Sequence, residues 1–435
     1  MPLLCDVDVL VVGGGAAGVA AAVVSAEAGK SVALVERYGF CGGAAVAGMS
    51  GTICGLYLAS DRRNAPEQVV FGFAERFRAG VSRRGGLTEP QVYGKTYTVT
   101  HDPLVWRETA DDLLREARVR IIFHAVVTGV VMDGDVFCGV VVESNAGRSL
   151  IKARRIIDAS GDAAVIARAG YRYVYGDHGR IQNPTMFFRL GNVDLAAFGT
   201  YWGIDTISPP KVVELIAALQ ADGSYRLPRS KIWIFPTVRP GELLVNATRL
   251  TARDGRMLNV IDPEDFTEAE ILGRAQVREY ARFLKDHVPG CAASFVVDTG
   301  VEAGIRQTRS IVGKETLRSA DVVAAKKRPD GICRVPWPIE LHSGDKPKLH
   351  WLLDDYYEVP YGALVPERGE NIIVAGRCLS AEHEALASAR VTAQCFEYGQ
   401  AAAIAAVMSL DRDCGFAQLR GEDVRAEMVQ RGSAL

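Results

Sequence analysis

The sequence predicts an α/β protein with a parallel sheet, into which a second unit of mixed α+β character is inserted. Residues 6–37 predict a strand, a glycine-rich turn, a helix and a second strand, which is the order of a parallel βαβ unit. Residues 176–354 instead mix prolines and tryptophans with short strands and short helices. A buried strand and an alanine-rich helix then return after residue 356, so the chain leaves one domain and comes back to it.

The first strand leads into glycines at the spacing G-x-G-x-x-G. Residues 6–12 form an apolar, β-branched run that suits a buried parallel strand. Gly13 allows a tight turn, Gly15 lets the backbone approach a pyrophosphate, and Gly18 lets the following helix pack on the strand. That helix is expected at residues 16–28, with its free N–H groups directed at the phosphate.

The second strand is expected at residues 31–35, and Glu36 follows directly at its end. A carboxylate at this position accepts hydrogen bonds from the ribose of an adenosine. The glycines, the strand before them, the helix after them and this acidic residue together predict a Rossmann-like dinucleotide site. The alternative is a tight turn between strand and helix that binds no ligand.

Other segments carry local signals. Residues 61–100 resemble an insertion, with a helix expected at 67–78. Asp102 is a predicted N-cap, followed by Pro103 at the start of a helix. Asp133-Gly134-Asp135 predicts a hairpin turn, and 391–410 predicts a long alanine-rich helix.

Composition excludes several classes of protein. The net charge of -2 gives no field that would attract nucleic acid or an anionic membrane. No apolar run reaches the roughly 18 residues of a membrane-spanning helix. The apolar N-terminal stretch belongs to the first strand and lacks a basic leader, so we expect a cytoplasmic protein.

The nine cysteines are scattered without a C-x-x-C pair. Iron–sulfur clusters, structural zinc and dithiol redox centres therefore lack their usual spacing, and no metal site is expected. Cys41 and Cys54 are the two cysteines expected near a ligand, either touching or bonding it, or as unreactive buried thiols.

Four blocks carry a resemblance to a known family: VVGGGAAG with Glu36, GFCGGAA, IIDASGDA and NIIVAGRCLSAEHEALASARVTAQCFEYGQAAAIAA. This arrangement resembles FAD-dependent oxidoreductases of the glutathione-reductase-like fold, in particular the family related to fumarate reductase and succinate dehydrogenase flavoproteins. The segments GIRQTRSIVGKETL, WPIELHSG and YYEVPYGALVPE are similar to the same family. The resemblance implies a three-layer Rossmann-like FAD-binding domain that holds FAD non-covalently.

On this basis the FAD-binding domain is expected to be discontinuous, at residues 1–175 and 355–435, with the insertion at about 61–100. Residues 176–354 are expected to form an α+β substrate or cap domain. A second G-x-G-x-x-G and the C-x-x-x-x-C pair of disulfide reductases are both missing, so a built-in NAD(P)H domain is not expected.

The resemblance also implies which residues hold FAD. Glu36 and Arg37 would hold the adenosine ribose, and the backbone at Val126 would meet the adenine. The segment with Ala389 and Val391 would lie under the flavin pyrimidine, where the next helix offers its positive dipole end. Around the pyrophosphate and ribityl chain, and at the turn after the last strand near FAD, the expected residues are Gly13, Gly15, Ala17, Gly18, Gly42, Gly43, Ala44, Ala159, Ser160, Gly161, Gly376 and Arg377.

Three side chains are candidates for catalysis. His342, with Glu340 as its neighbour, is a candidate acid/base, and the alternative is an interface histidine satisfied by backbone groups. His383 lies between two glutamates that would raise its pKa, and the alternative is a surface histidine. Arg390 is the preferred candidate for binding a substrate carboxylate or a developing negative charge, ahead of Arg306 and Arg309, although arginine more often pairs at the surface.

The expected function is hydride transfer between a small organic substrate and N5 of the flavin, by a dehydrogenase or oxidase. The alternatives are a flavin reductase or monooxygenase fed by NAD(P)H, and an FAD-carrying electron-transfer subunit of a larger complex. The expected partner is a small-molecule substrate, without nucleic acid or membrane. A homo-oligomer remains open.

Overall fold

The computed structural model describes residues 1–62, 64–202, 205, 208–342 and 348–435. Its centre is a parallel sheet with the strand order β5-β2-β1-β8-β19. The last strand comes from the end of the chain and pairs with β8 through Ile372 and Ile156, so the C-terminal segment completes the N-terminal domain. The strands are β1 (Leu3–Val12), β2 (Val32–Val35), β5 (Arg120–Ile122), β8 (Gly147–Asp158) and β19 (Ile372–Val374).

Different layers cover the two faces of this sheet. In β1, Val9 and Val11 pack against the helices α1 (Ala16–Glu27) and α10 (Thr392–Asp411). Leu10 and Val12 face the opposite way, toward a core shared with β6, β7 and α4. This alternation follows from the two-residue period of a strand. The resulting three-layer α/β arrangement confirms the predicted fold class.

The opposite layer is an antiparallel extension of the same sheet. Strands β6 (Val126–Asp133) and β7 (Val136–Ser144) form a hairpin around Gly134, as predicted, and β7 pairs with the first half of β8. The short helix α4 (Ala164–Arg168) follows β8 and packs against β6 and β8.

Small side chains bring α1 and α10 together. A Cβ added to Gly399 would lie 2.1 Å from the carbonyl oxygen of Ala17. Only glycine at this position of α10 allows the two backbones to approach this closely. The helix predicted at 391–410 is confirmed, and Gly399 accounts for its close packing on α1.

The insertion contains α2 (Gly72–Arg83) and the hairpin of β3 (Gln91–Tyr93) with β4 (Thr96–Thr98). A helix is predicted at 67–78, but α2 begins and ends five residues later. The chain enters α2 through Gly72, whose φ of +59° is incompatible with a helix continuing from earlier residues. The next helix, α3 (Pro103–Glu116), is capped by Asp102, which accepts hydrogen bonds from the N–H groups of Leu104 and Val105 at 2.8 and 3.3 Å.

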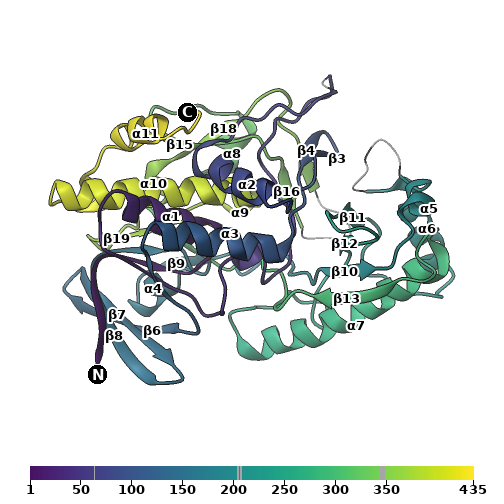
Figure 1. Ribbon diagram of the computed structural model, residues 1–435, viewed down its shortest axis with the longest axis horizontal. Helices are drawn as coiled ribbons and strands as arrows, with labels where there is room; N and C mark the ends of the chain where they lie inside the picture. The colour runs from purple at the N-terminus through teal and green to yellow at the C-terminus, as the bar shows by residue number, and fades with distance from the viewer. Residues whose placement is uncertain (63, 203–204, 206–207, 343–347) are drawn as a thin grey trace.

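A second antiparallel sheet has the order β11-β12-β10-β13 and its own core between Met186 and Ala303 (Figure 1). The helix α7 packs along it, below the sheet in the view of Figure 1. The elements are β10 (Phe188–Gly191), α5 (Leu195–Gly199), α6 (Pro210–Ala221), β11 (Trp233–Pro236), β12 (Leu243–Asn246), α7 (Pro263–His287) and β13 (Phe295–Thr299).

The predicted limits of the second domain, 176–354, stay a prediction, but the packing within this range is not uniform. Leu317, Val335 and Leu352 belong to the core that also contains α1 and α10, not to the core of the second sheet. The short strands of this stretch pack against α9 and α10, a contact that no local sequence pattern shows.

The remaining elements are short. Ser343 and Gly344 of the WPIELHSG segment lie outside the described residues. Within the described ranges, no helix combines the length and the apolarity needed to cross a bilayer. The elements are β9 (Tyr173–Tyr175), β14 (Arg309–Ile311), α8 (Ser319–Val323), β15 (Gly331–Val335), β16 (Ile339–Leu341), β17 (Lys348–His350), β18 (Tyr357–Pro360), α9 (His383–Ala389), α11 (Gly421–Gln430) and the 3₁₀ turns η1 (Gly43–Ala45), η2 (Tyr361–Ala363) and η3 (Phe416–Gln418).

Candidate active site

A cavity of about 630 Å³ extends from the carboxyl ends of the parallel strands to the second sheet. Val12, Val35 and Ala375 line it where β1, β2 and β19 end, and Phe235 and Asn246 line it from β11 and β12. In an open α/β sheet this edge is where ligands bind. The cavity therefore lies between the two cores, at the place where the glycine motif predicts a nucleotide.

Two glycine turns form a wall of bare backbone in this cavity. Gly13 has φ of +100°, and a Cβ there would lie 2.6 Å from the carbonyl oxygen of Ala159. A Cβ on Gly43 would lie 3.0 Å from Cα of Gly15. The N–H of Gly42 donates to the carbonyl of Gly14 at 2.8 Å, which joins the turns. The absence of side chains here leaves room for a pyrophosphate against the backbone.

Glu36 lies at the end of β2, is 6% exposed and lines the cavity. One carboxylate oxygen accepts the N–H of Gly14 at 2.6 Å and the other accepts the N–H of Tyr38 at 2.9 Å. An ionised carboxylate has about four acceptor positions, so two remain for ribose hydroxyls. The residue thus fits the predicted ribose contact.

The structure brings nearly all the predicted FAD residues into one cavity. Gly18 and Ala389 are the exceptions. A Cβ on Gly18 would lie 1.8 Å from the carbonyl oxygen of Gly13. Gly18 therefore allows the start of α1 to pack closely on the turn, as expected. Ala389 is buried in α9 away from the lining. The lining residues are Gly13, Gly15, Ala17, Glu36, Arg37, Gly42, Gly43, Ala44, Val126, Ala159, Ser160, Gly161, Gly376, Arg377 and Val391.

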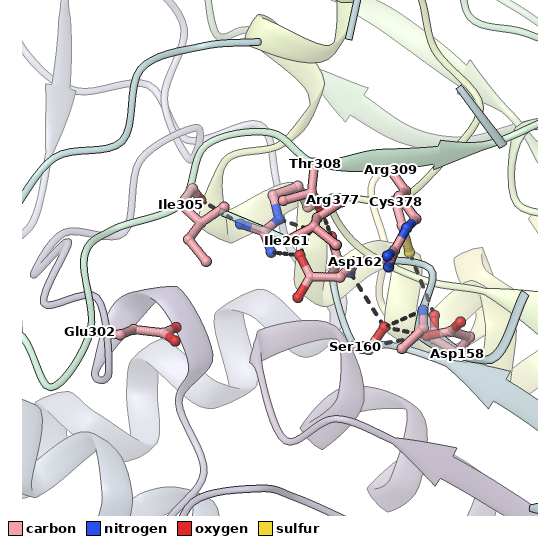
Figure 2. Close-up of polar contacts among 12 residues, drawn as sticks. Asp158, Ser160, Asp162, Ile261, Glu302, Ile305, Thr308, Arg309, Arg377 and Cys378 are labelled. Carbon is pink, nitrogen blue, oxygen red and sulfur yellow. Dashed lines mark hydrogen bonds and ion pairs between the residues drawn. The ribbon is translucent and has the colours of Figure 1, made fainter. Parts of the chain in front are cut away.

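Arg377 fixes the junction between the FAD-binding sheet and the second unit (Figure 2). Its guanidinium donates to the carbonyls of Gly161 and Ile305 at 3.0 and 2.5 Å and to the carboxylate of Asp162 at 2.7 Å. Thr308 donates to the same carboxylate oxygen at 2.7 Å. Three segments far apart in the sequence are therefore held at one edge of the cavity.

Glu302 makes a second connection across the cavity. It forms an ion pair with Arg37, and the hydroxyl of Tyr38 donates to it at 2.5 Å. Burial alone would lower the pKa of Arg37, but the charge of Glu302 raises it. The sequence analysis missed Glu302 and Asp162. Asp162 follows directly after the predicted turn, whereas Glu302 carries no local signal because its partners are far away in the chain.

The other end of the cavity contains a buried polar group made of Tyr93, Glu340 and His342. The Tyr93 hydroxyl donates to Oε1 of Glu340 at 2.7 Å, and Nε2 of His342 lies 3.6 Å from the same oxygen. Burial and the charge of Arg306 lower the pKa of His342, so the imidazole is neutral at pH 7. Burial would raise the pKa of Glu340, but His342, Tyr93 and Arg390 lower it, so the carboxylate is ionised.

Arg390 lines this end, as predicted, and so does Arg306. Arg390 caps the C-terminus of α9 and donates to the side-chain oxygen of Gln182 at 2.9 Å. Burial lowers its pKa to about 10, so it remains charged at pH 7. Val391 and Thr392, at the start of α10, line the cavity beside it, where the positive end of the helix dipole is expected.

His383 does not join this group. It begins α9, outside the cavity lining. Burial lowers the pKa of His383 more than the charges of Asp177 and Glu384 raise it, so the prediction of a raised pKa is wrong although Glu384 acts in the expected direction.

Of the two candidate cysteines, Cys54 lines the cavity and Cys41 does not. Burial raises the pKa of Cys54 to about 11, despite hydrogen bonds with Thr52 and Thr98, so its thiol is protonated. Among the described residues, no three histidine, cysteine, aspartate or glutamate side chains gather as metal ligands.

Residues 8–428 match the model of the FAD dependent oxidoreductase family. The chain belongs to this family. The match covers nearly the whole chain, and the glycine cradle and Glu36 described above fit FAD. The protein is therefore an FAD-dependent oxidoreductase, and the cofactor predicted from the sequence is confirmed.

Two solved structures are similar to this oxidoreductase at low sequence identity. A geranylgeranyl bacteriochlorophyll reductase-like protein of Thermoplasma acidophilum aligns over 98% of this chain and 82% of its own, at a TM-score of 0.50 and 15% identity. This similarity shows the fold alone. The p-nitrophenol 4-monooxygenase of Pseudomonas putida aligns over 98% of this chain and 84% of its own, at a TM-score of 0.47 and 12% identity.

A urocanate reductase of Eggerthella lenta is 61% identical over 41 residues. The match covers 9% of this chain and spans only 7% of the length of that reductase.

Proposed function

We propose that this FAD-dependent oxidoreductase is a dehydrogenase or oxidase that takes a hydride from a small organic substrate. The observation that carries the proposal is the buried group of Glu340, His342 and Tyr93 in the same cavity as the FAD-binding residues. Pockets between two domains are the usual position for a substrate. FAD, when bound, supplies the two-electron acceptor at its ring nitrogen N5.

His342 would act as the base. Its imidazole is neutral at pH 7, because burial and Arg306 lower its pKa, so it has a lone pair for a substrate proton. Glu340 remains ionised 3.6 Å away and would stabilise the imidazolium that forms. Tyr93 donates to Glu340 at 2.7 Å and would hold the carboxylate toward the histidine.

The chemistry balances with this one base. His342 would take the proton of the substrate O–H or N–H, and bound FAD would supply the acceptor for the hydride of the neighbouring C–H bond. The product is a carbonyl or imine, oxidised by two electrons. The balance would be closed by molecular oxygen as the final oxidant in an oxidase, or by a separate electron acceptor in a dehydrogenase.

The alternatives differ in where the electrons come from. A reductase or monooxygenase would receive them from NADH or NADPH, and an electron-transfer subunit would pass them on without a substrate of its own. The polar group at the inner end of the cavity supports an organic substrate, which a pure electron carrier does not need. A small-molecule partner is part of this proposal.

The experiment compares His342→Asn with the wild type in substrate-driven anaerobic reduction of the FAD-loaded protein. A panel of alcohols, amines and hydroxy or amino acids supplies the substrate. We expect the variant to be slower by about 10²- to 10⁴-fold, the usual contribution of a positioned base. The matched control is His178→Asn, because His178 is exposed and its φ of +50° suits asparagine. Equal rates for His342→Asn and the wild type would contradict the proposal.

The pH dependence gives a second readout. A base must be deprotonated, so kcat/KM falls as the pH drops through the pKa of His342. Because burial lowers this pKa, we expect the acid limb below the ordinary histidine value of 6.5, and we expect it to disappear in His342→Asn. An acid limb that is the same in both proteins would assign the proton transfer to another group.

A further inference from the structure

Three arginines gather at the inner end of the cavity, of which Arg229 and Arg306 are buried and Arg390 is half-buried. Arg306 and Arg390 line it, while Arg229 lies behind, with its guanidinium 4.4 Å from the centre of the Trp233 ring. Arg306 is 8% exposed and Arg229 is 4% exposed. They come from the segment before β14, the end of α9 and the segment before β11, so only the folded chain brings them together.

Among the described residues, the hydrogen bonds of these arginines go to neutral oxygens. Arg306 donates to the carbonyl of Asn183 at 2.6 Å, Arg390 to the amide of Gln182 at 2.9 Å, and Arg229 to the amide of Asn246 at 3.2 Å. In the same part of the structure, Nε of Arg390, Nε2 of Gln182 and the side-chain amide of Asn183 have no hydrogen-bond partner. Donor groups are thus left over at this end.

The carboxylates that line the cavity do not balance this charge. Glu302 pairs with Arg37, Asp162 pairs with Arg377, and Glu36 accepts backbone N–H groups. Of the described acidic residues in the lining, this leaves Glu340 at the arginine end. Burial, and after it the like charges of Arg229 and Arg390, lower the pKa of Arg306.

Buried cations that outnumber the carboxylates beside them are costly, and an anion that enters next to them offsets the cost. We propose that the substrate carries a carboxylate, bound by Arg306 and Arg390, and an apolar body that lies against the neighbouring aromatic side chains. Phe187, Phe235 and Trp337 line the cavity and supply this apolar surface. The planar guanidinium matches a carboxylate with two parallel hydrogen bonds. This inference rests on the proposed function, since it names the substrate class of the same site.

The test measures equilibrium binding to the FAD-loaded protein, with benzoate as the probe. Benzamide is the uncharged analogue of the same shape, and inorganic phosphate is an anion without an apolar body. Calorimetry and the perturbation of the visible FAD bands each give a Kd. We expect benzoate to bind about tenfold or more tightly than benzamide, as for a charge-assisted hydrogen bond, and phosphate to bind more weakly than benzoate.

Variants locate the binding. Arg390→Gln and Arg306→Lys are each expected to weaken benzoate binding about tenfold or more while leaving benzamide binding unchanged. The matched control is Arg253→Gln, because Arg253 is exposed on the second unit. The wild-type comparison of benzoate with benzamide needs no variant, so it remains decisive if a buried substitution prevents folding.

Equal binding of benzoate and benzamide to the wild type would overturn the inference. Phosphate binding as tightly as benzoate would also overturn it, because the site would then be a free-anion site. Binding does not require turnover, so the two proposals fail separately. A protein that binds benzoate through Arg390 but is not reduced by any alcohol, amine or organic acid of the panel would keep the carboxylate site and lose the proposed function.

Discussion

Gly13 and Gly15 belong to one motif, but a methyl group added to each would meet different surroundings. At Gly13 it would lie 2.6 Å from a backbone oxygen, and the φ of +100° is unsuited to alanine. At Gly15 the backbone is extended, with φ of -69°, and the nearest atom is 3.9 Å away, across the cavity wall. Gly13 is therefore needed for the conformation and packing of the turn, whereas Gly15 leaves space for the ligand.

We therefore expect Gly13→Ala to lower the Tm of the protein, by an amount that corresponds to strain of about 1–3 kcal/mol. Gly15→Ala is expected to keep the Tm of the FAD-free protein but to raise the Kd for FAD about tenfold or more, because its methyl group occupies the space of the pyrophosphate. Calorimetric melting and a fluorescence titration with FAD measure the two quantities. If Gly15→Ala bound FAD with wild-type affinity, the pyrophosphate would not lie against the backbone at Gly15.

The individual side chains differ in how well the sequence predicts them. Glu36 could be predicted because its spacing from the glycines is set within one βαβ unit. His342 and Arg390 could be proposed from short segments, and the structure places both on the cavity. Glu302, Gln182 and Asn183 could not be predicted, since each acquires its surroundings from residues that are more than a hundred positions away.

Among the elements, α2 shows how distant parts of the chain set a boundary. The N–H of Phe73 donates to the side chain of Gln400 in α10 at 2.7 Å. Glu397, also in α10, lies against Gly72 and accepts the hydroxyl of Ser433 at 2.6 Å. Both the start of α2 and the C-terminal segment are thus held by polar side chains of one buried helix.

Glu397 makes this junction dependent on pH. Burial raises its pKa to about 7, more than the hydrogen bond from Ser433 lowers it. Between pH 4.5 and 7 the folded protein keeps a proton that the unfolded chain releases. The free energy of unfolding therefore falls as the pH rises through this window, by on the order of 3 kcal/mol from this group.

We expect Glu397→Gln to remove this contribution, so that urea unfolding at pH 5 and pH 8 shows a smaller fall in stability than in the wild type. Glu116→Gln is the matched control, because Glu116 is exposed at the end of α3. If the free energy of unfolding fell as much between pH 5 and pH 8 in Glu397→Gln as in the wild type, Glu397 would not be the source of the pH dependence.

Elements whose limits are set by neighbours in sequence were predicted well. Asp102 with Pro103 marks the start of α3, and Gly134 marks the β6–β7 turn, because capping and turn chemistry act over a few residues. The start of α2 was displaced because the side chains that hold it come from α10. The packing of the short strands between residues 331 and 360 could not be predicted for the same reason, since β15 and β16 pack on α10 and α9, which come later in the chain.

For the molecule as a whole, the return of the chain to its first domain could be predicted, because β19 and α10 repeat the buried pattern of the N-terminal unit. The cavity between the two cores could not be located from the sequence, since its walls come from both sheets and from the segments that connect them. Its two ends differ in chemistry, with bare glycine backbone at one and Arg306 and Arg390 beside Glu340 at the other.

The central claim is that the FAD of this protein is reduced by an organic substrate and not by a nicotinamide. The most direct test is the visible spectrum of the FAD-loaded protein under anaerobic conditions, first with NADH or NADPH and then with a panel of organic acids. We predict that the flavin bands persist with either nicotinamide and bleach with an acid that carries an oxidisable C–H group. Rapid bleaching by NADH or NADPH, with no response to any acid, would contradict the claim and favour a reductase or monooxygenase.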